Sequence, residues 1–113
     1  MKSRTYVPDR GDIVWLDFNP QAGHEQRGRR PALTVSYKEY NAKIGLGLFC
    51  PITSKVKGYP FEVEVRGTSV NGCVLSDQVK SLDWRVRNVE HIEKLNEERL
   101  NDVISNIVIL MKK

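Results

Sequence analysis

The sequence predicts a mainly β protein, a small and strongly curved barrel with one amphipathic helix at its C-terminal end. Short apolar runs separated by turn residues recur from Gly11 to Val86 and indicate about six strands with tight connections. After Asn96 the apolar spacing changes to that of a helix. The chain has 113 residues, enough for one compact domain but short for two, so residues 1–113 are expected to form a single domain.

The first half of the chain predicts three strands and one helical turn. Gly11–Phe18 is apolar and β-branched between turn residues, and Ala32–Ser36 has the same character. The polar link Tyr37–Lys43 is expected to form a helical turn before a third strand at Gly45–Cys50. Pro51 is expected to end that strand.

The second half predicts three further strands. Phe61–Val65 alternates between apolar and acidic side chains, which is typical of a half-exposed strand. The turn signal Asn71-Gly72 leads into a strand at Cys73–Ser76. The segment Val79–Val86 is expected to be one more strand.

The C-terminal segment has the signals of an amphipathic helix and a surplus of apolar residues. Asn96 can cap its N-terminus, and Glu97 and Glu98 suit the positive end of the helix dipole. The apolar residues at helical spacing are Leu100, Val103, Ile104 and Ile107. Residues 108–111 extend the apolar surface beyond one stripe, which predicts the interface of a homodimer.

The two cysteines and two histidines do not have the spacing of a metal site. Cys50 and Cys73 lie in apolar, strand-like contexts without a CxxC pair, so we expect reduced core residues. His24 and His91 are far apart in the sequence. We therefore predict neither a metal site nor a cofactor.

The charge of the chain is uneven. The formal net charge is +4, but residues 90–102 contain five acids and two bases, which leaves sixteen bases and nine acids elsewhere, a net +7. This distribution favours a polyanionic partner such as nucleic acid, although many solvated surfaces are basic. The sequence shows neither a signal peptide nor a stretch long enough to span a bilayer, so we expect a cytoplasmic protein with no membrane partner.

A glycine-bounded loop at Gly23–Pro31 sets one carboxylate among three arginines. The guanidinium groups of Arg27, Arg29 and Arg30 offer forked donors that match phosphate oxygens. Glu25 can act as a carboxylate base. This combination favours RNA cleavage over simple RNA binding.

Within this loop Arg30 is the candidate that would stabilise negative charge on a reacting phosphate. Pro31 holds Arg30 extended at the start of a strand and so gives it a rigid anchor. His24 stands beside the candidate base and could touch the substrate. The alternative is a solvated, charged turn in which Arg30 pairs with an acid such as Asp77.

A second polar cluster follows the third predicted strand. Thr53 and Ser54 supply hydroxyls there, and Thr53 could donate to a phosphate oxygen. Lys57 could neutralise an RNA backbone, and Tyr59 could stack on a base. The alternative is a turn in which the hydroxyls cap backbone groups and Tyr59 packs on the barrel.

A third cluster contains Asp77, Gln78 and Lys80 at a strand junction. Such groups can contact the edges of unstacked bases. The alternative is that Asp77 fixes a loop.

Several runs in their order along residues 4–87 resemble the MazF/PemK family of toxin endoribonucleases. The runs are Gly11–Trp15, Asp17–Pro20, Gly23–Gln26, Arg30–Ala32, Tyr40–Asn41, Lys57–Val63 and Asp77–Ser81. The combination is far more specific than any single run. Beyond Arg87 the similarity weakens.

The resemblance implies an SH3-like barrel of the CcdB/PemK kind and a homodimer. It implies the toxin of a type II toxin-antitoxin system, which cleaves single-stranded mRNA at short sequences without a metal, leaves 2′,3′-cyclic phosphate and 5′-hydroxyl ends, and so inhibits translation and growth. It places the catalytic positions on Glu25, Arg30 and Thr53, and adds Phe18 and Asn41 to the RNA-binding candidates named above.

The partners implied are single-stranded mRNA and an antitoxin. The antitoxin would be MazE-like, with a flexible acidic segment that occupies the cationic groove in place of RNA. Two other functions stay open at this point. One is a CcdB-like toxin that binds DNA gyrase without catalysis, although this chain lacks a tryptophan-bearing tail, and the other is an RNA-binding barrel without chemistry.

Overall fold

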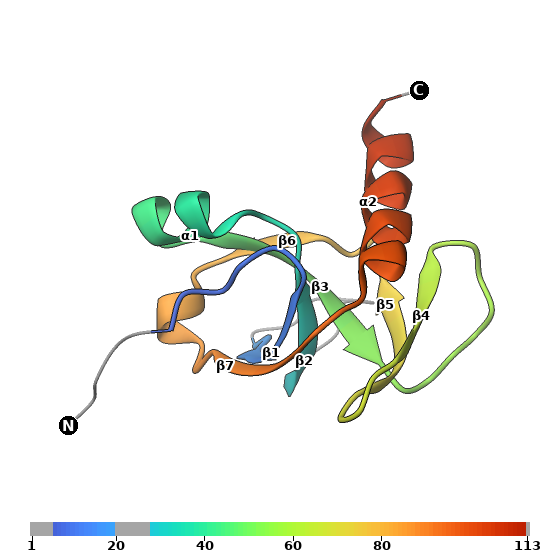
Figure 1. Ribbon diagram of the computed structural model, residues 1–113, viewed down its shortest axis with the longest axis horizontal. Helices are drawn as coiled ribbons and strands as arrows, with labels where there is room; N and C mark the ends of the chain where they lie inside the picture. The colour runs from blue at the N-terminus through green and yellow to red at the C-terminus, as the bar shows by residue number, and fades with distance from the viewer. Residues whose placement is uncertain (1–5, 20–27, 113) are drawn as a thin grey trace.

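The computed structural model describes residues 6–19 and 28–112, which form an antiparallel sheet curled into a half-barrel with two helices (Figure 1). The strands are β1 (Asp12–Asp17), β2 (Arg29–Thr34), β3 (Gly47–Thr53), β4 (Glu62–Arg66), β5 (Asn71–Leu75), β6 (Lys80–Leu82) and β7 (Glu90–Lys94), and the helices are α1 (Lys38–Ile44) and α2 (Glu97–Met111). The order in the sheet is β4-β5-β3-β2-β1-β7, and β6 also pairs with β3. The predicted fold class, a small mainly β barrel with a C-terminal helix, is confirmed.

The sheet carries an apolar cluster on each face. Leu33 and Cys50 belong to the cluster that packs against α2. Their chain neighbours Ala32 and Phe49 belong to the second cluster, together with Trp84. Successive side chains of a strand point to opposite faces, so strands covered on both sides are apolar almost throughout. Both cysteines of the chain are free and buried, as predicted.

The strand β3 runs through Pro51, so the prediction that Pro51 ends it is wrong. Pro51 lies opposite Ala32 of β2. On the other edge of β3 the partner changes here, from β6 as far as Phe49 to β5 from Ile52 onward. The missing N–H of Pro51 falls at this change of partner, which is a position where a sheet tolerates proline.

The predicted strand Val79–Val86 is correct only in its first part. β6 ends at Leu82, and a short 3₁₀ helix follows at Trp84–Val86. Asp83 caps this turn by accepting a hydrogen bond from the backbone N–H of Arg85 at 3.0 Å. The buried indole of Trp84 donates to the backbone oxygen of Asn41 in α1 at 3.3 Å, which draws the chain inward and away from an extended path.

Strand β7 was not expected from the sequence, because only one of its five residues, Ile92, is apolar. It pairs with β1 as an edge strand. The carboxylate of Glu93 accepts the backbone N–H groups of Thr68, Ser69 and Val70, each at 3.0 Å. Glu93, which no sequence pattern singled out, therefore stabilises the turn between β4 and β5.

The two helices agree with the prediction. Helix α1 covers most of the expected helical turn. Helix α2 begins after Asn96, whose side chain accepts the N–H of Arg99 at 2.9 Å, and it buries Leu100 and Val103 in the core. Among the described residues no helix is long and apolar enough to cross a membrane.

Asp12 joins β1 to β7 and to the N-terminal segment. The Nζ atom of Lys94 lies 2.8 Å from Asp12 Oδ1, the backbone N–H of Asp9 donates to Oδ2 at 3.0 Å, and the hydroxyl of Tyr6 donates to the same oxygen. Burial would raise the pKa of Asp12, but the hydrogen bonds from Lys94 and Tyr6 outweigh it and hold that pKa below its ordinary value.

The lowered pKa of Asp12 predicts a stability that depends on pH. The stabilisation is fully present above the ordinary aspartate pKa and is lost as the pH falls through the lowered one. We expect Asp12→Asn to reduce the free energy of unfolding by roughly 1–3 kcal/mol at neutral pH, because buried donors lose a charged acceptor. Urea unfolding of both proteins at a series of pH values from neutral to acid should show that the difference between their unfolding free energies decreases as the pH falls. A difference that stays constant with pH would contradict this assignment.

Candidate functional site

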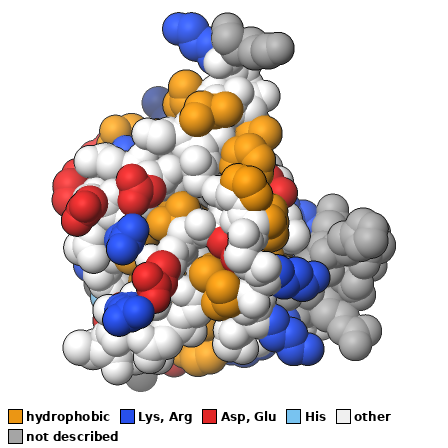
Figure 2. All heavy atoms as spheres, turned by 90° about the vertical axis from the view of Figure 1, so that its right-hand side faces the viewer, with side chains coloured by type: hydrophobic (Ala, Val, Ile, Leu, Met, Phe, Trp, Pro, Cys, Tyr) orange, Lys and Arg blue, Asp and Glu red, His pale blue; other side chains and the backbone are white. Residues whose placement is uncertain are grey.

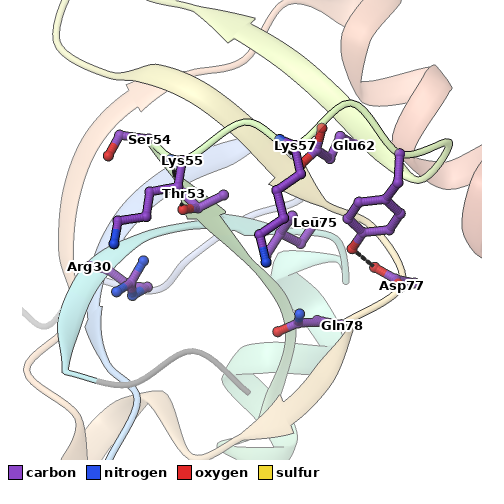
Figure 3. Close-up of a pocket in the computed structure, with 10 residues that line it drawn as sticks. Arg30, Thr53, Ser54, Lys55, Lys57, Glu62, Leu75, Asp77 and Gln78 are labelled. Atoms are coloured by element: carbon purple, nitrogen blue, oxygen red, sulfur yellow. Dashed lines mark hydrogen bonds between the residues drawn. The ribbon is translucent and has the colours of Figure 1, made fainter. Parts of the chain in front are cut away.

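A cavity of about 550 Å³ opens between the end of β3, the β3–β4 loop and the turn after β5 (Figure 3). We call it the Arg30 cavity. Its lining residues are Arg30, Thr53, Ser54, Lys55, Lys57, Tyr59, Glu62, Leu75, Asp77 and Gln78. Leu75 alone among them is an aliphatic residue, so the cavity suits a polar ligand.

Two neighbouring arginines of β2 point to opposite sides of the sheet. Arg29 lies opposite Asp17 of β1, and its guanidinium is 3.3 Å from the Asp17 carboxylate and 2.9 Å from that of Glu90 in β7. Arg30, the next residue, lines the cavity instead. The pleat of one strand thus assigns one arginine to ion pairs and the other to the site.

Thr53 ends β3 beside Arg30. Counting on from Ala32, which faces Pro51, brings Arg30 opposite Thr53, and residues that face each other across an antiparallel pair share one side of the sheet. The Oγ1 atom of Thr53 accepts the backbone N–H of Lys55 at 3.0 Å. This bond orients the hydroxyl and leaves its hydrogen able to donate to a ligand.

Gly72 allows β5 to pass close to the end of β3. Its φ is +149°, and a Cβ atom built on it would lie 2.2 Å from the carbonyl oxygen of Thr53. A side chain at this position would therefore push Thr53 or β5 aside. The sequence suggested a turn at Asn71-Gly72, but both residues lie within β5.

Hydrogen bonds of two hydroxyl groups, those of Tyr59 and Ser76, stabilise the side of the cavity formed by the turn after β5. The hydroxyl of Tyr59 donates to Asp77 at 2.7 Å, the bond drawn dashed in Figure 3. Burial, and then this hydrogen bond, raise the pKa of Tyr59, so the phenol stays protonated. The hydroxyl of Ser76 donates to the backbone oxygen of Phe61 and accepts the side-chain amide of Asn106 in α2 at 3.0 Å.

The electrostatics of the cavity favour an anion. Arg30, Lys55 and Lys57 line it, whereas the carboxylates of Glu62 and Asp77 already accept hydrogen bonds from the chain itself. Burial lowers the pKa of Arg30, but from a value so high that the guanidinium remains charged at neutral pH. Within residues 6–19 and 28–112 no three His, Cys, Asp or Glu side chains gather as metal ligands.

Gln78 contributes a side-chain amide to the lining of the cavity. Its backbone N–H donates to the oxygen of Leu75 at 3.0 Å and fixes the turn after β5. Its side-chain Oε1 is buried and has no hydrogen-bond partner within residues 6–19 and 28–112. Figure 3 shows the side chains of Gln78 and Lys57 both extending into the cavity. A glutamine side-chain amide carries both a donor and an acceptor, the groups that bind the edges of nucleobases.

The cavity brings together seven of the residues predicted from the sequence. They are Arg30, Thr53, Ser54, Lys57, Tyr59, Asp77 and Gln78. His24, Glu25 and Arg27 lie outside the described residues. Their roles stay predictions, as do the roles of the seven.

Four predicted RNA contacts lie elsewhere. Phe18 and Asn41 are 1% and 0% exposed, so neither side chain is available to RNA, and Asn41 instead bonds the hydroxyl of Ser36 at 2.6 Å. Arg29 is held by its two acids on the other side of the sheet. Lys80 begins β6 opposite Phe49 and is not among the lining residues.

Sequence reasoning also missed two charged residues of the cavity. Lys55 stands between Ser54 and Lys57, two residues that were named, so its position was a usable signal. Glu62 belongs to the alternating strand and was interpreted only as part of an exposed acidic face. Nothing in a two-residue period distinguishes it from Glu64.

The family of the chain follows from comparison with known proteins. A family model described as "PemK-like, MazF-like toxin of type II toxin-antitoxin system" matches residues 9–111. The chain belongs to this family. The resemblance found in the sequence is thereby confirmed.

Curated relatives carry the name of one enzyme class. The endoribonuclease toxin MazF of Escherichia coli K12 is 44% identical over 106 residues, which cover 94% of this chain and 96% of that protein. The endoribonuclease toxin ChpB of the same strain is 33% identical over 102 residues, which cover 85% of this chain and 87% of ChpB. Both names agree with the enzyme class predicted from the sequence, an endoribonuclease.

Solved structures agree in fold. MazF from Deinococcus radiodurans superimposes with a TM-score of 0.92 at 48% identity, covering 96% of this chain and 100% of that one. A MazE-MazF crystal structure from the same organism matches with a TM-score of 0.84 at 42% identity, covering 95% of this chain and 97% of that one.

The contact of Gly72 with Thr53 predicts a strong substitution effect. Gly72→Ala should cost more than about 1 kcal/mol of unfolding free energy, because the alanine meets a backbone oxygen at an unfavourable φ. Asn71→Ala, the exposed neighbour on the same strand, should stay within about 0.5 kcal/mol of the parent. Chemical denaturation of the three proteins tests this, and equal stabilities would refute the tight approach.

Proposed function

We propose that this protein is the toxin of a type II toxin-antitoxin system and that it acts in the cytoplasm as a sequence-specific endoribonuclease on single-stranded mRNA. The observation that carries the proposal is the meeting of Arg30 and Thr53 at one cationic cavity. The predicted base, Glu25, precedes Arg30 by five residues in the sequence. Membership of the MazF-like family supports the same activity.

The proposed chemistry is attack of a ribose 2′-hydroxyl on its own phosphate. Glu25 takes the 2′ proton, the 2′ oxygen bonds to phosphorus, and the bond from phosphorus to the 5′ oxygen breaks. The leaving 5′ oxygen takes a proton from water and Glu25 returns its proton to the solvent, so the products are a 2′,3′-cyclic phosphate and a 5′-hydroxyl. A carboxylate base and donors that stabilise the phosphate are available as side chains, and we therefore propose a reaction that proceeds without a metal ion.

Arg30 and Thr53 would stabilise the phosphate as its charge increases. The guanidinium of Arg30 offers two parallel donors to the phosphate oxygens, and the hydroxyl of Thr53 offers one more. Both sit on paired strands, so their positions are set before RNA arrives. Such preorganised donors stabilise the transition state more than the ground state.

The remaining lining residues would hold the RNA strand. Lys57 is placed to neutralise backbone phosphate, the ring of Tyr59 offers a stacking surface, and Gln78 offers an amide to a base edge. The same cationic cavity would accept an acidic, flexible segment of a MazE-like antitoxin, which would then compete with RNA.

The proposed assembly is a homodimer built on the end of α2. Val108, Ile109, Leu110 and Met111 are between 48% and 80% exposed. Figure 2 shows apolar side chains gathered along the upper part of the face in view, where α2 lies. Exposed apolar groups of this extent are typical of an interaction surface.

The activity is tested by incubating the protein with labelled single-stranded RNA in the presence of EDTA. Parental protein should give discrete fragments with cyclic phosphate ends, and Arg30→Ala should cleave at least about a hundredfold more slowly, as is usual when a stabilising donor is removed. Glu25→Ala should behave likewise. Arg29→Ala, the neighbour that points away, should keep the cleavage rate within about threefold and lose stability instead.

Other outcomes would decide for the other functions. Parental rates in both Arg30→Ala and Glu25→Ala would overturn the proposed site. Intact RNA with a mobility shift would indicate a binding barrel without chemistry, and intact RNA with stalled gyrase would indicate a CcdB-like toxin.

The dimer is tested by placing a charge on α2. Ile109→Asp should weaken self-association by at least about tenfold, because burial of a large apolar side chain is worth about 1.5–3 kcal/mol. Val86→Asp changes an apolar side chain that is 74% exposed on the 3₁₀ helix and should leave association unchanged. Light scattering over a concentration series measures both, and a fully dimeric Ile109→Asp would exclude this interface.

A further inference from the structure

Glu62 is a carboxylate in a cavity that otherwise attracts anions. Both of its oxygens are used within the β3–β4 loop. Oε2 accepts the backbone N–H of Lys57 at 2.9 Å, and Oε1 accepts that of Gly58 at 2.7 Å. In Figure 3 the Glu62 side chain lies beside the backbone at Lys57, behind the lysine side chain. The acid therefore binds the loop backbone.

These two bonds hold the middle of the loop. Near its beginning, the N–H of Lys55 is bonded to Thr53. Near its end, the N–H of Glu62 donates to the oxygen of Tyr59 at 3.1 Å. Between these points the chain turns at Gly58, whose φ is +86°, and among the described residues no atom lies within 4 Å of the position that a Cβ on Gly58 would take. The two bonds to the Glu62 carboxylate are therefore the contacts that restrain the backbone N–H groups of Lys57 and Gly58 at this turn.

The turn carries the groups that would meet RNA bases and phosphate. Lys57 and Tyr59 flank Gly58 and both line the cavity. The hydroxyl of Tyr59 can donate to Asp77 only while the backbone of residues 57–59 keeps this conformation. Arg30 and Thr53, by contrast, are held by strand pairing, Arg30 opposite Leu16 of β1 and Thr53 opposite Cys73 of β5, and neither pair includes this turn.

Resting on the proposed function, we propose that Glu62 is a positioning residue that fixes the 57–59 turn and thereby determines which RNA sequences the cavity accepts. It acts through Lys57 and Tyr59 and does not touch RNA. A carboxylate suits this position beside a phosphate site because each of its two equivalent oxygens accepts one of the two N–H groups.

Glu64 provides a matched control on the same strand. It lies two residues on, on the same side of β4, but its carboxylate pairs with Arg66 at 2.7 Å and is 49% exposed. Removing Glu64 deletes the same charge from the same strand without releasing the loop. An effect of Glu62 that is merely electrostatic would appear in both variants.

The experiment measures single-site RNA cleavage, a cleavage map on a long transcript, and amide hydrogen exchange. Glu62→Ala should raise KM about tenfold and change kcat less than about threefold, because binding contacts are loosened while Arg30 and Thr53 stay in place. The map should gain sites that the parental protein ignores. The KM and the cleavage map of Glu62→Gln should lie between those of the parental protein and of Glu62→Ala. The glutamine oxygen can accept one backbone N–H, but its NH₂ group cannot accept the other.

Further readouts keep the inference testable if a variant is unstable. Gly58→Ala strains the same turn at a positive φ without touching β4, and it should also widen the cleavage map. The amides of Lys57 and Gly58 should exchange slowly in the parental protein and in Glu64→Ala, and faster in Glu62→Ala. A merely structural role of Glu62 would lower the active fraction and leave the map unchanged.

The outcomes separate this inference from the proposed function. If the parental protein does not cleave RNA, the proposed function fails, and exchange at Lys57 and Gly58 still decides whether Glu62 holds the turn. If the parental protein cleaves but Glu62→Ala keeps its KM and its map, the inference alone fails. Equal effects of Glu62→Ala and Glu64→Ala would overturn it as well.

Discussion

The pairing of β2 with β3 is the constraint on which the site depends. Because side chains alternate along a strand, the adjacent residues Arg29 and Arg30 cannot share a face, and the Asp17 and Glu90 carboxylates take the first of them. The register of β2 and β3, continued two residues beyond the pair Ala32 and Pro51, brings the second arginine to the side of the sheet where Thr53 also lines the cavity. A shift of one residue would exchange the two arginines and leave the cavity without its guanidinium.

Carboxylates organise this basic protein from within. Glu93 accepts hydrogen bonds from the β4–β5 turn and Glu62 accepts them from the β3–β4 loop. Asp77 accepts one from the hydroxyl of Tyr59. Asp12 anchors the N-terminal segment to β7. Acids bound to the chain's own donors compete less for Lys55 and Lys57, so these cations can attract an external anion.

The sequence predicted those features that depend on neighbours in the chain. The helix start at Asn96 and the placement of Arg30 by Pro31 follow from local rules, and both are in the structure. Strand β7 was invisible because an edge strand needs few apolar residues. The clamp by Glu62 was missed because its backbone partners become apparent only in three dimensions. Burial of Asn41 was missed for the same reason: it arises from packing of α1 under Trp84.

Two hydrogen bonds, from Asn106 to Ser76 and from Ser76 to Phe61, connect helix α2 to the end of the β3–β4 loop. The apolar end of the same helix begins two residues further along the chain, at Val108. The dimer contacts and the RNA contacts proposed above would therefore involve elements that these hydrogen bonds join. In the proposed toxin, a displacement of α2 at the dimer interface would be passed through Ser76 to the end of the loop that carries Lys57 and Tyr59.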